Sequence, residues 1–384
     1  MTVLAALTLL AWAYLLGLRG GFWRARERLA VGAEEPLSGW PAVVAIVPAR
    51  DEAELIGRSI ASLLRQDYPG AFSVILADDQ SSDGTAEQAR RGAAGNAGRL
   101  RVVAVPPHPA GWVGKVWAMA QALAAADDEA AEYLWFTDAD IAHAPGMLRA
   151  LVAKAETERR DLVSVMVRLS CRAGVERLLI PAFVYFFQTL YPFAWVADPA
   201  RATAAAAGGS MLVRRSALAA AGGLAAIRGA LIDDCALAGL LKARSGRLWL
   251  GLCDAAESLR PYDRLAPVWR MVARSAYTQL RHSPVLLALT LAGLVLVYLA
   301  PPSLVLLSPW HGDSAAAALA FAAWGLMALS FAPMLRAYRQ PLWLAVALPL
   351  AAALYALMTA DSARRHWQGS GGAWKGRVMP AGGQ

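Results

Sequence analysis

Asp138 and Asp140 are the residues of this sequence best suited to bind a divalent metal ion. They follow the apolar run 133–137, which has the character of a buried β-strand. Residues two apart in an extended chain point to the same side, and carboxylate oxygens are ligands that Mg2+ and Mn2+ prefer. The spacing indicates a metal ion bridged to a diphosphate, although a plain strand followed by a polar loop gives the same triplet.

A second acidic stretch, 78–85, follows another apolar run at 72–77. It opens with Asp78 and Asp79 and ends with Asp83, Gly84 and Thr85. Asp83 and Thr85 are residues that commonly cap helices. A solvated turn leading into a helix is therefore the alternative to a binding loop here.

Strands must alternate with helices to bring these two acidic stretches together. We expect strands at 42–48, 72–77, 101–105, 133–137 and 162–169, and helices at 52–66, 86–91 and 115–126. This alternation predicts an α/β fold with a mostly parallel sheet. Open sheets of this kind bind ligands at the carboxyl ends of their strands, where both acidic stretches lie.

The composition indicates a membrane protein. The chain of 384 residues is 57% hydrophobic, with a mean hydropathy of +0.40, which is high for a soluble enzyme. The net charge of +8 suits an anionic membrane face, and no basic cluster with interleaved aromatics favours nucleic acid. The three cysteines are widely spaced and predict neither a zinc site nor a disulfide framework.

Residues 1–20 have the length and composition of a membrane anchor. Four arginines follow within the basic linker 21–40 or just before it: Arg19, Arg24, Arg26 and Arg28. A signal peptide carries its positive charge before the apolar run, so we expect an uncleaved anchor. By the positive-inside rule, the chain after it is cytoplasmic.

Further apolar segments follow in the second half of the chain. The aromatic segment 181–196 is either an interfacial segment or a buried core helix. Residues 263–283 include an amphipathic helix at 265–280, and 284–361 include three apolar stretches at 285–307, 315–335 and 342–360. Three full crossings would place the basic tail 362–384 outside, whereas its positive charges favour the inside. One stretch is therefore expected to be re-entrant or interfacial, and Pro301-Pro302 makes the first a candidate.

Several motifs in order resemble those of family 2 glycosyltransferases with the GT-A fold. They are Pro48-Ala49-Arg50-Asp51-Glu52, Asp78-Asp79 with Ser81 and Asp83-Gly84-Thr85, Gly111-Trp112 with Gly114-Lys115, Asp138-Ala139-Asp140, Gly208-Gly209-Ser210 with Arg214-Arg215, and Ile232-Asp233-Asp234. The resemblance covers 41–262. The anchor, the C-terminal apolar stretches and Trp374-Lys375-Gly376-Arg377 resemble a lipid-modifying branch. That branch includes ceramide glucosyltransferase-like and carotenoid glycosyltransferase-like proteins. Within it, this chain most resembles the hopene-associated glycosyltransferases of hopanoid gene clusters.

The resemblance implies roles for individual residues. The nucleotide-sugar-binding residues would be Pro48, Ala49, Arg50, Asp51, Glu52, Asp78, Asp79, Lys115, Asp138, Gly209 and Arg274. Asp138 and Asp140 would hold Mg2+ or Mn2+ on the diphosphate. Lys115 contacts phosphate or sugar on this interpretation, and is otherwise a surface lysine. Arg274 binds either the leaving diphosphate or lipid headgroups, because only the arginine of the polysaccharide-synthase Gln-x-x-Arg-Trp motif is present.

Asp234, beside Asp233, is the candidate general base for the acceptor hydroxyl. Neighbouring carboxylates can raise one another's pKa, as a base requires, although both could instead cap the helix 235–242. His143 is close enough in sequence to Asp140 to reach a metal, but a loop histidine is the plainer interpretation.

The sequence thus predicts a multi-pass enzyme of the bacterial inner membrane with a cytoplasmic catalytic domain. It would transfer a sugar with inversion from a UDP-sugar to a lipid hydroxyl in hopanoid biosynthesis. A polyprenyl-phosphate sugar synthase and a non-enzymatic membrane scaffold are the alternatives. The scaffold offers no physical reason to retain Asp79, Asp138, Asp140 and Asp234 together.

Overall fold

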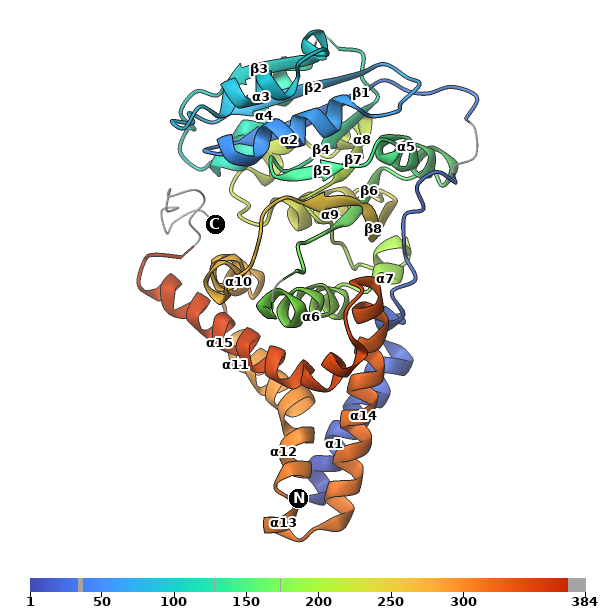
Figure 1. The fold of residues 1–384 in the computed structure, drawn as a ribbon, viewed down its shortest axis with the longest axis vertical. Helices are drawn as coiled ribbons and strands as arrows, with labels where there is room; N and C mark the ends of the chain where they lie inside the picture. The colour runs from blue at the N-terminus through green and yellow to red at the C-terminus, as the bar shows by residue number, and fades with distance from the viewer. Residues whose placement is uncertain (34–36, 128, 173, 372–384) are drawn as a thin grey trace. The chain divides into compact units, whose positions relative to one another are not determined.

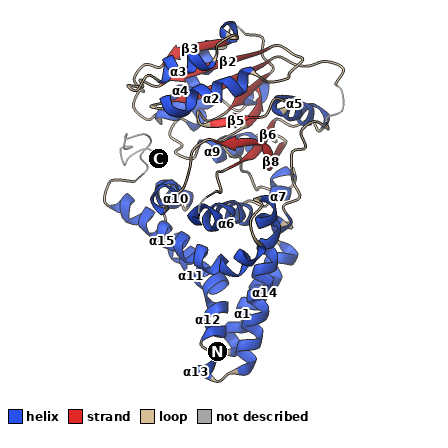
Figure 2. Cartoon of the chain, in the orientation of Figure 1, coloured by secondary structure: helices blue, strands red, loops and turns tan. Residues whose placement is uncertain are grey.

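The computed structural model describes residues 1–33, 37–127, 129–172 and 174–371 (Figure 1). The chain forms two compact units. Unit 1 is helical and comprises Met1–Arg26, Cys171–Ala194 and the described residues from Tyr262 to Gly371. Unit 2 comprises Glu27–Ser170 and Trp195–Pro261 and contains the named strands of the described chain (Figure 2). The motif Trp374-Lys375-Gly376-Arg377 lies outside the described residues.

Unit 2 is built on a mixed, mostly parallel sheet with the order β3-β2-β1-β4-β7-β6-β8-β5. The strands are β1 (Val43–Ala49), β2 (Phe72–Asp78), β3 (Leu100–Ala104), β4 (Tyr133–Phe136), β5 (Ile141–His143), β6 (Leu162–Arg168), β7 (Met211–Arg214) and β8 (Leu248–Ser258). β3, β2, β1 and β4 run parallel to one another, whereas β7 is antiparallel to both β4 and β6. Every residue of β1 and β4 is buried, which explains their uninterrupted apolar sequences.

Helices cover the sheet and complete the core of unit 2. They are α2 (Ala53–Leu64), α3 (Thr85–Gly92), α4 (Gly114–Ala125), α5 (Met147–Thr157), α8 (Arg215–Ala220) and α9 (Asp233–Ala243), with short 3-10 turns η2 (Ala97–Arg99) and η3 (Leu224–Ile227). In α2, Ile56, Ile60 and Leu63 recur at helical spacing and are fully buried. They pack in one core with Trp135 of β4, whose indole nitrogen donates to the Ser210 hydroxyl.

Unit 1 consists of α1 (Thr2–Leu18), η1 (Phe22–Arg24), α6 (Gly174–Leu190), α10 (Leu265–Gln279), α11 (Pro284–Leu294), the π-helix η4 (Val295–Leu299), α12 (Ala300–Leu306), α13 (Ser308–His311), α14 (Ser314–Ala337), η5 (Leu342–Ala347) and α15 (Leu348–Trp367). α7 (Phe193–Ala197) lies where the chain passes into unit 2. Three helical segments are long and apolar enough to cross a membrane: Pro284–Leu306, Ser314–Ala337 and Leu342–Trp367. α1 is a shorter apolar helix of 17 residues.

The aromatic segment 181–196 is mostly the second half of α6, with Pro181 inside the helix. Tyr185 is fully buried and makes edge contacts with Phe22 and Phe331 of the same unit. This inward face fits the second of the two expectations for the segment, a buried core helix. Leu190 at its end is 56% exposed.

α1 is joined to the irregular helix formed by α11, η4 and α12. The carbonyl of Val297 faces Pro301 and Pro302 along the helix, which lack the amide hydrogens that an α- or π-helical bond would need. Trp12 of α1 supplies the missing donor, with Nε1 2.9 Å from that oxygen. Its ring also meets Tyr298 edge-on.

The structure confirms the predicted α/β fold with a mostly parallel sheet and about three C-terminal apolar helices. β1, β2, β3, β4 and β6 lie at the expected positions. β5 and β8 were not expected, and they form one edge of the sheet as an antiparallel pair.

Candidate active site

Hydrogen bonds join the loops after β1 and β2 into one platform. Ala49 pairs with Asp78 at the ends of these parallel strands. Arg50 donates from Nη1 to the Asp79 carbonyl at 2.6 Å and lies 3.7 Å from its fully buried carboxylate. The predicted residues Arg50, Asp78 and Asp79 therefore belong to one hydrogen-bonded platform at the carboxyl edge of the sheet, next to Pro48.

The platform extends through the start of α2. Asp51 has a positive φ of 48°, a conformation uncommon outside glycine. Its amide donates to Ser81 and its carboxylate accepts from the amide of Ser82, which fixes this backbone. Glu52, the N-cap of α2, donates its amide to Thr85.

Asp83 caps two helices at once. One carboxylate oxygen accepts from the amide of Ala53 at 2.9 Å and the other from the amide of Thr85 at 3.0 Å. Burial raises the pKa of Asp83, but the hydrogen bonds from the Thr85 hydroxyl and from these two amides together outweigh it, so the pKa is lowered. The capping alternative for this stretch is therefore real, and it shapes the loop that contains Asp78 and Asp79.

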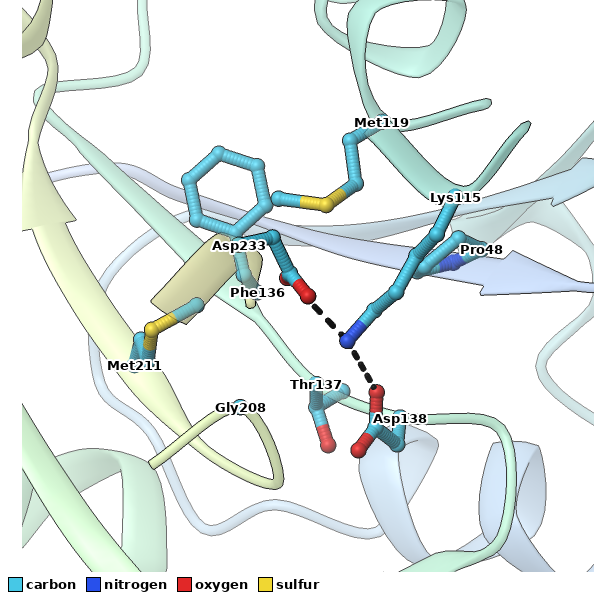
Figure 3. A pocket seen from close by; sticks show the side chains of 9 residues that line it. All are labelled: Pro48, Lys115, Met119, Phe136, Thr137, Asp138, Gly208, Met211 and Asp233. Carbon is cyan, nitrogen blue, oxygen red and sulfur yellow. Dashed lines mark ion pairs between the residues drawn. The ribbon is translucent and has the colours of Figure 1, made fainter. Parts of the chain in front are cut away.

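Lys115 holds together acids from two elements (Figure 3). Its Nζ lies 2.9 Å from Asp138 Oδ1, in the turn after β4, and 3.1 Å from Asp233 Oδ2, at the start of α9. Burial alone would lower the pKa of Lys115, but these carboxylates raise it, so the ammonium stays charged. With 18% of its side chain exposed, Lys115 is not an ordinary surface lysine. It lines a small pocket with Pro48, Met119, Phe136, Thr137, Asp138, Gly208, Met211 and Asp233.

Asp234 lies directly beside this pocket. Its carboxylate accepts from the amides of Gly208 at 2.8 Å and Cys235 at 2.7 Å. Burial, and next the charge of Asp233, raise the pKa of Asp234 to about 6. A carboxylate with this pKa is ionised at neutral pH and still accepts a proton readily, as a general base must.

Two glycines allow the loop before β7 to approach these acids. A side chain at Gly208 would begin 3.3 Å from Lys115 Nζ and 3.4 Å from Asp234 Oδ2. At Gly209 it would begin 2.8 Å from Val167. The predicted Gly209 therefore acts by close backbone packing, and Gly208 leaves room beside the charged groups.

Arg260 is a site residue that the sequence did not reveal. It follows β8 and donates from Nε to Asp140 Oδ2 at 2.8 Å, and from Nη2 to Glu52 at 2.6 and 2.8 Å. Asp138 and Asp140 therefore face different cations, because the chain after β4 turns instead of remaining extended. Burial, then the charge of Asp138, raise the pKa of Asp140 despite Arg260. The run 248–253 has the apolar character of a strand, and this was the one available signal for a residue at its end.

His143 is a buried residue of β5 instead of a loop histidine. Its Nε2 is 2.9 Å from the Thr137 hydroxyl, whose own hydrogen goes to the Gly209 carbonyl at 2.8 Å. Nε2 therefore carries the imidazole hydrogen. Burial lowers the pKa of His143 to about 3. The residue supports the turn before Asp138 and the glycine loop.

The acids fit a divalent cation shared with a ligand. Asp138 and Asp140 offer oxygen atoms of the right chemistry, but nowhere in the described residues do three or more His, Cys, Asp or Glu side chains converge on a metal position. A Mg2+ ion is often held by one or two carboxylates together with substrate phosphates and water. The residues present suit that arrangement better than a cage of protein ligands.

The structure brings most of the predicted site residues together in unit 2. Lys115, Asp138, Asp233 and Pro48 line one pocket, and Asp234 contacts its edge through Gly208. Arg274 is exposed on α10 in unit 1. Its contact with a diphosphate remains a prediction.

Comparisons with known proteins agree with this architecture. Residues 44–220 match the family described as Glycosyl transferase family 2. The structure is similar to that of the mannosyltransferase PcManGT from Pyrobaculum calidifontis in complex with GDP-Man and Mn2+, with 22% identity and a TM-score of 0.57, over 93% of this chain and 98% of that one. No curated protein matches the chain.

Two looser likenesses involve other solved structures. S. aureus TarS has 16% identity and a TM-score of 0.41, over 62% of this chain and 40% of that chain. Mannosyl-3-phosphoglycerate synthase from Rubrobacter xylanophilus has 20% identity and a TM-score of 0.41, over 68% of this chain and 83% of that chain.

Proposed function

We propose that this glycosyltransferase moves a sugar from a UDP-sugar to a lipid hydroxyl. The premise is that residues 44–220 match the Glycosyl transferase family 2 domain and that this domain has a GT-A fold. The reaction would take place at a membrane and would invert the configuration of the anomeric carbon of the sugar. The observation that carries the proposal is the convergence of Asp138, Lys115 and Asp233 in one pocket, with Asp234 at its edge. Each element contributes at the carboxyl edge of the sheet or at a helix start, where anionic ligands bind.

The nucleoside of the donor would lie on the platform after β1 and β2. The buried Asp79 and the neighbouring Asp78 offer carboxylate acceptors for the N–H and O–H groups of a base and ribose. Arg50 keeps the Asp79 loop in place. The diphosphate would reach Asp138 and Asp140, and a bound divalent cation would neutralise the charge that develops as it leaves.

Lys115 and Arg260 already neutralise these two carboxylates. Both cations remain charged, and both would meet the phosphates as the donor enters. A rearrangement of their ion pairs would then accompany donor binding. This supports a role for Lys115 at the diphosphate, one of the two interpretations of the sequence.

Asp234 would act as the base. The acceptor oxygen forms its bond to the anomeric carbon as the bond from that carbon to the diphosphate breaks, and the hydroxyl proton passes to Asp234. A single displacement of this kind inverts the anomeric centre. An already ionised acceptor, such as a polyprenyl phosphate, would need no such base, and this remains the competing function.

The lipid acceptor is proposed from the apolar helices of unit 1 and from the sequence resemblance, which points to hopanoid biosynthesis in the bacterial inner membrane. The guanosine donor named for the P. calidifontis mannosyltransferase makes GDP-mannose the matched alternative to UDP-sugars. A scaffold that only retained the fold would bind donor without transferring the sugar.

One assay tests donor, acceptor and base together. The purified full chain is incubated with radiolabelled UDP-sugars or GDP-mannose, total bacterial lipids, and Mg2+ or Mn2+. We expect a labelled lipid from a UDP-sugar, no product with Asp140→Ala, and donor binding without product with Asp234→Asn. Asp254→Asn, an exposed acid paired with Arg28, should behave as wild type. Full transfer by Asp234→Asn would refute the assigned base, and label only on a polyprenyl phosphate would favour the competing function.

A further inference from the structure

The arginines of unit 1 are distributed unevenly along the chain. No Lys or Arg occurs in residues 1–18 or 284–335, so α1, α11, α12, α13 and all but the last turn of α14 carry none. Exposed arginines lie instead at Arg24, Arg26, Arg270, Arg274, Arg281, Arg336, Arg339 and Arg364. Contacts within unit 1 show that these stretches share one end.

α1 and α14 start together and run in the same direction. The amide and hydroxyl of Thr2 both donate to the Asp313 carboxylate, at 3.1 and 2.7 Å. We call this the N-terminal end of unit 1. At the other end of α1, Arg19 donates to the Thr189 carbonyl at 2.8 Å. We call the end marked by Arg19 and Thr189 the arginine end.

The helix formed by α11, η4 and α12 crosses in the opposite direction. Leu287, near its start, packs against Tyr277 of α10. Leu304, near its finish, packs against Ala5 of α1 and Ala316 of α14. The Pro301-Pro302 pair therefore does not turn this segment back, contrary to the expectation that made it the re-entrant candidate. Figure 1 shows α1, α12 and α14 running side by side.

α6 and α10 lie along the arginine end. Just before α6, the Cys171 carbonyl accepts from Gln340, three residues beyond α14. At the other end of α6, Thr189 binds Arg19, and Tyr191 bonds with Gln279 at the end of α10. Both ends of α6 are thus at the arginine end. The chain therefore passes between unit 1 and unit 2 at the arginine end, after Arg26, before Cys171 and after Leu190.

The third candidate span, Leu342–Trp367, returns to the end from which it starts. Gln340 is held at the arginine end by Arg177, at 2.8 Å. η5 then passes beside Trp324, whose Nε1 donates to the Val346 carbonyl at 3.2 Å. Trp324 precedes the end of α14 by 13 residues, which is about 20 Å of helix.

α15 then runs back from this depth. Trp269 of α10 donates to Asp361 at 2.7 Å, and the ring of His366 stacks on that of His282 at 4.1 Å. His282 belongs to the turn between α10 and α11, at the arginine end. Asp361 also binds Arg364 and Arg365, so the last turns of α15 are charged and suit the membrane surface.

We infer that unit 1 crosses the bilayer three times, through α1, the helix from α11 to α12, and α14, and that η5 and α15 form a re-entrant segment. Ser370 then lies on the same side as unit 2, and Met1 and Asp313 lie on the other. The arginine end would face the anionic cytoplasmic leaflet. This topology goes beyond the proposed function. It also removes a conflict in the sequence, where three full C-terminal crossings would place the basic tail outside.

The side of each end can be tested by labelling single cysteines in the full chain. Cys171, Cys235 and Cys253 are replaced by serine, and Ser245→Cys, Ser314→Cys and Ser370→Cys are made one at a time. Ser245 reports unit 2, Ser314 the N-terminal end and Ser370 the finish of the re-entrant segment. A membrane-impermeant maleimide should label only Ser314→Cys in intact cells, and all three after lysis.

Labelling of Ser370→Cys but not Ser245→Cys in intact cells would overturn the re-entrant segment. Labelling of Ser245→Cys but not Ser314→Cys would overturn the orientation. If the cysteine-free chain does not accumulate, C-terminal fusions to the unaltered chain decide: green fluorescent protein should fluoresce, and alkaline phosphatase activity would refute the inference. Sugar transfer by the same fusions is measured separately, so failure of the proposed function is distinguishable.

Discussion

The pH dependence of transfer tests the role of Asp234 most directly. With a pKa of about 6, about 91% of this carboxylate is ionised at pH 7 and about 9% at pH 5. We therefore expect kcat/KM to fall about tenfold between these pH values. Asp234→Asn should lose about 10²- to 10⁴-fold in kcat, the usual contribution of a general base. This variant should also lose the fall in kcat/KM towards low pH, which is the acidic limb of the pH profile.

Two neighbouring changes should move that limb in opposite directions. The charge of Asp233 raises the pKa of Asp234, whereas that of Lys115 lowers it. Asp233→Asn should therefore shift the midpoint of the limb below pH 6, and Lys115→Gln should shift it above. Plateau rates will also fall, because both residues line the pocket, so the midpoint is the relevant readout.

The assay measures initial rates of labelled-lipid formation from pH 4.5 to 8 at subsaturating donor, with thermal unfolding at each pH as the control for folding. Asp254→Asn serves as the matched acid substitution. A midpoint that stays fixed in both the Asp233 and Lys115 variants would refute Asp234 as the titrating base. The acidic limb would then belong to the donor, the acceptor or another group.

Three further predictions concern stability. Gly209→Ala places a methyl 2.8 Å from Val167 and should cost about 1–3 kcal/mol, seen as a lower unfolding temperature. The pKa of His143 falls from 6.5 to about 3 on folding, so the unfolded chain takes up a proton at a higher pH than the folded chain. The free energy of unfolding should therefore fall by about 2 kcal/mol from pH 8 to pH 5. His143→Gln should abolish this part of the pH dependence. Trp12→Phe leaves the Val297 carbonyl without a donor and should cost about 0.5–1.5 kcal/mol when unfolding is measured in detergent.

Long buried strands were the easiest elements to predict. β1 and β4 have uninterrupted apolar sequences, and β2 has an apolar run at 74–77, because these strands lie inside the sheet. β5 has three residues, too few for a pattern. β8 was missed although its first half is apolar, because its second half, 254–258, carries acids and alanines.

The acids of the site could be predicted from their types and order, but their partners could not. Asp138 and Lys115 are joined only once β4 and α4 are packed. Arg260 meets Asp140 and Glu52 across separations of 120 and 208 residues, for which no local pattern exists. His143 looked like a loop residue because the strand that contains it was not expected.

The bond between Trp12 and Val297 cannot form until Val297 has been synthesised. The two residues are 285 positions apart, so at about 5–20 residues per second the ribosome needs roughly 15 to 60 s to supply the partner of α1. On the three-crossing topology inferred above, α1 would lie in the bilayer without its neighbours during that interval, while the whole of unit 2 emerges behind it. On that topology the helices of unit 1 would complete their packing last, around the helix that was made first, and a chain arrested before Val297 would leave the Trp12 indole without this acceptor.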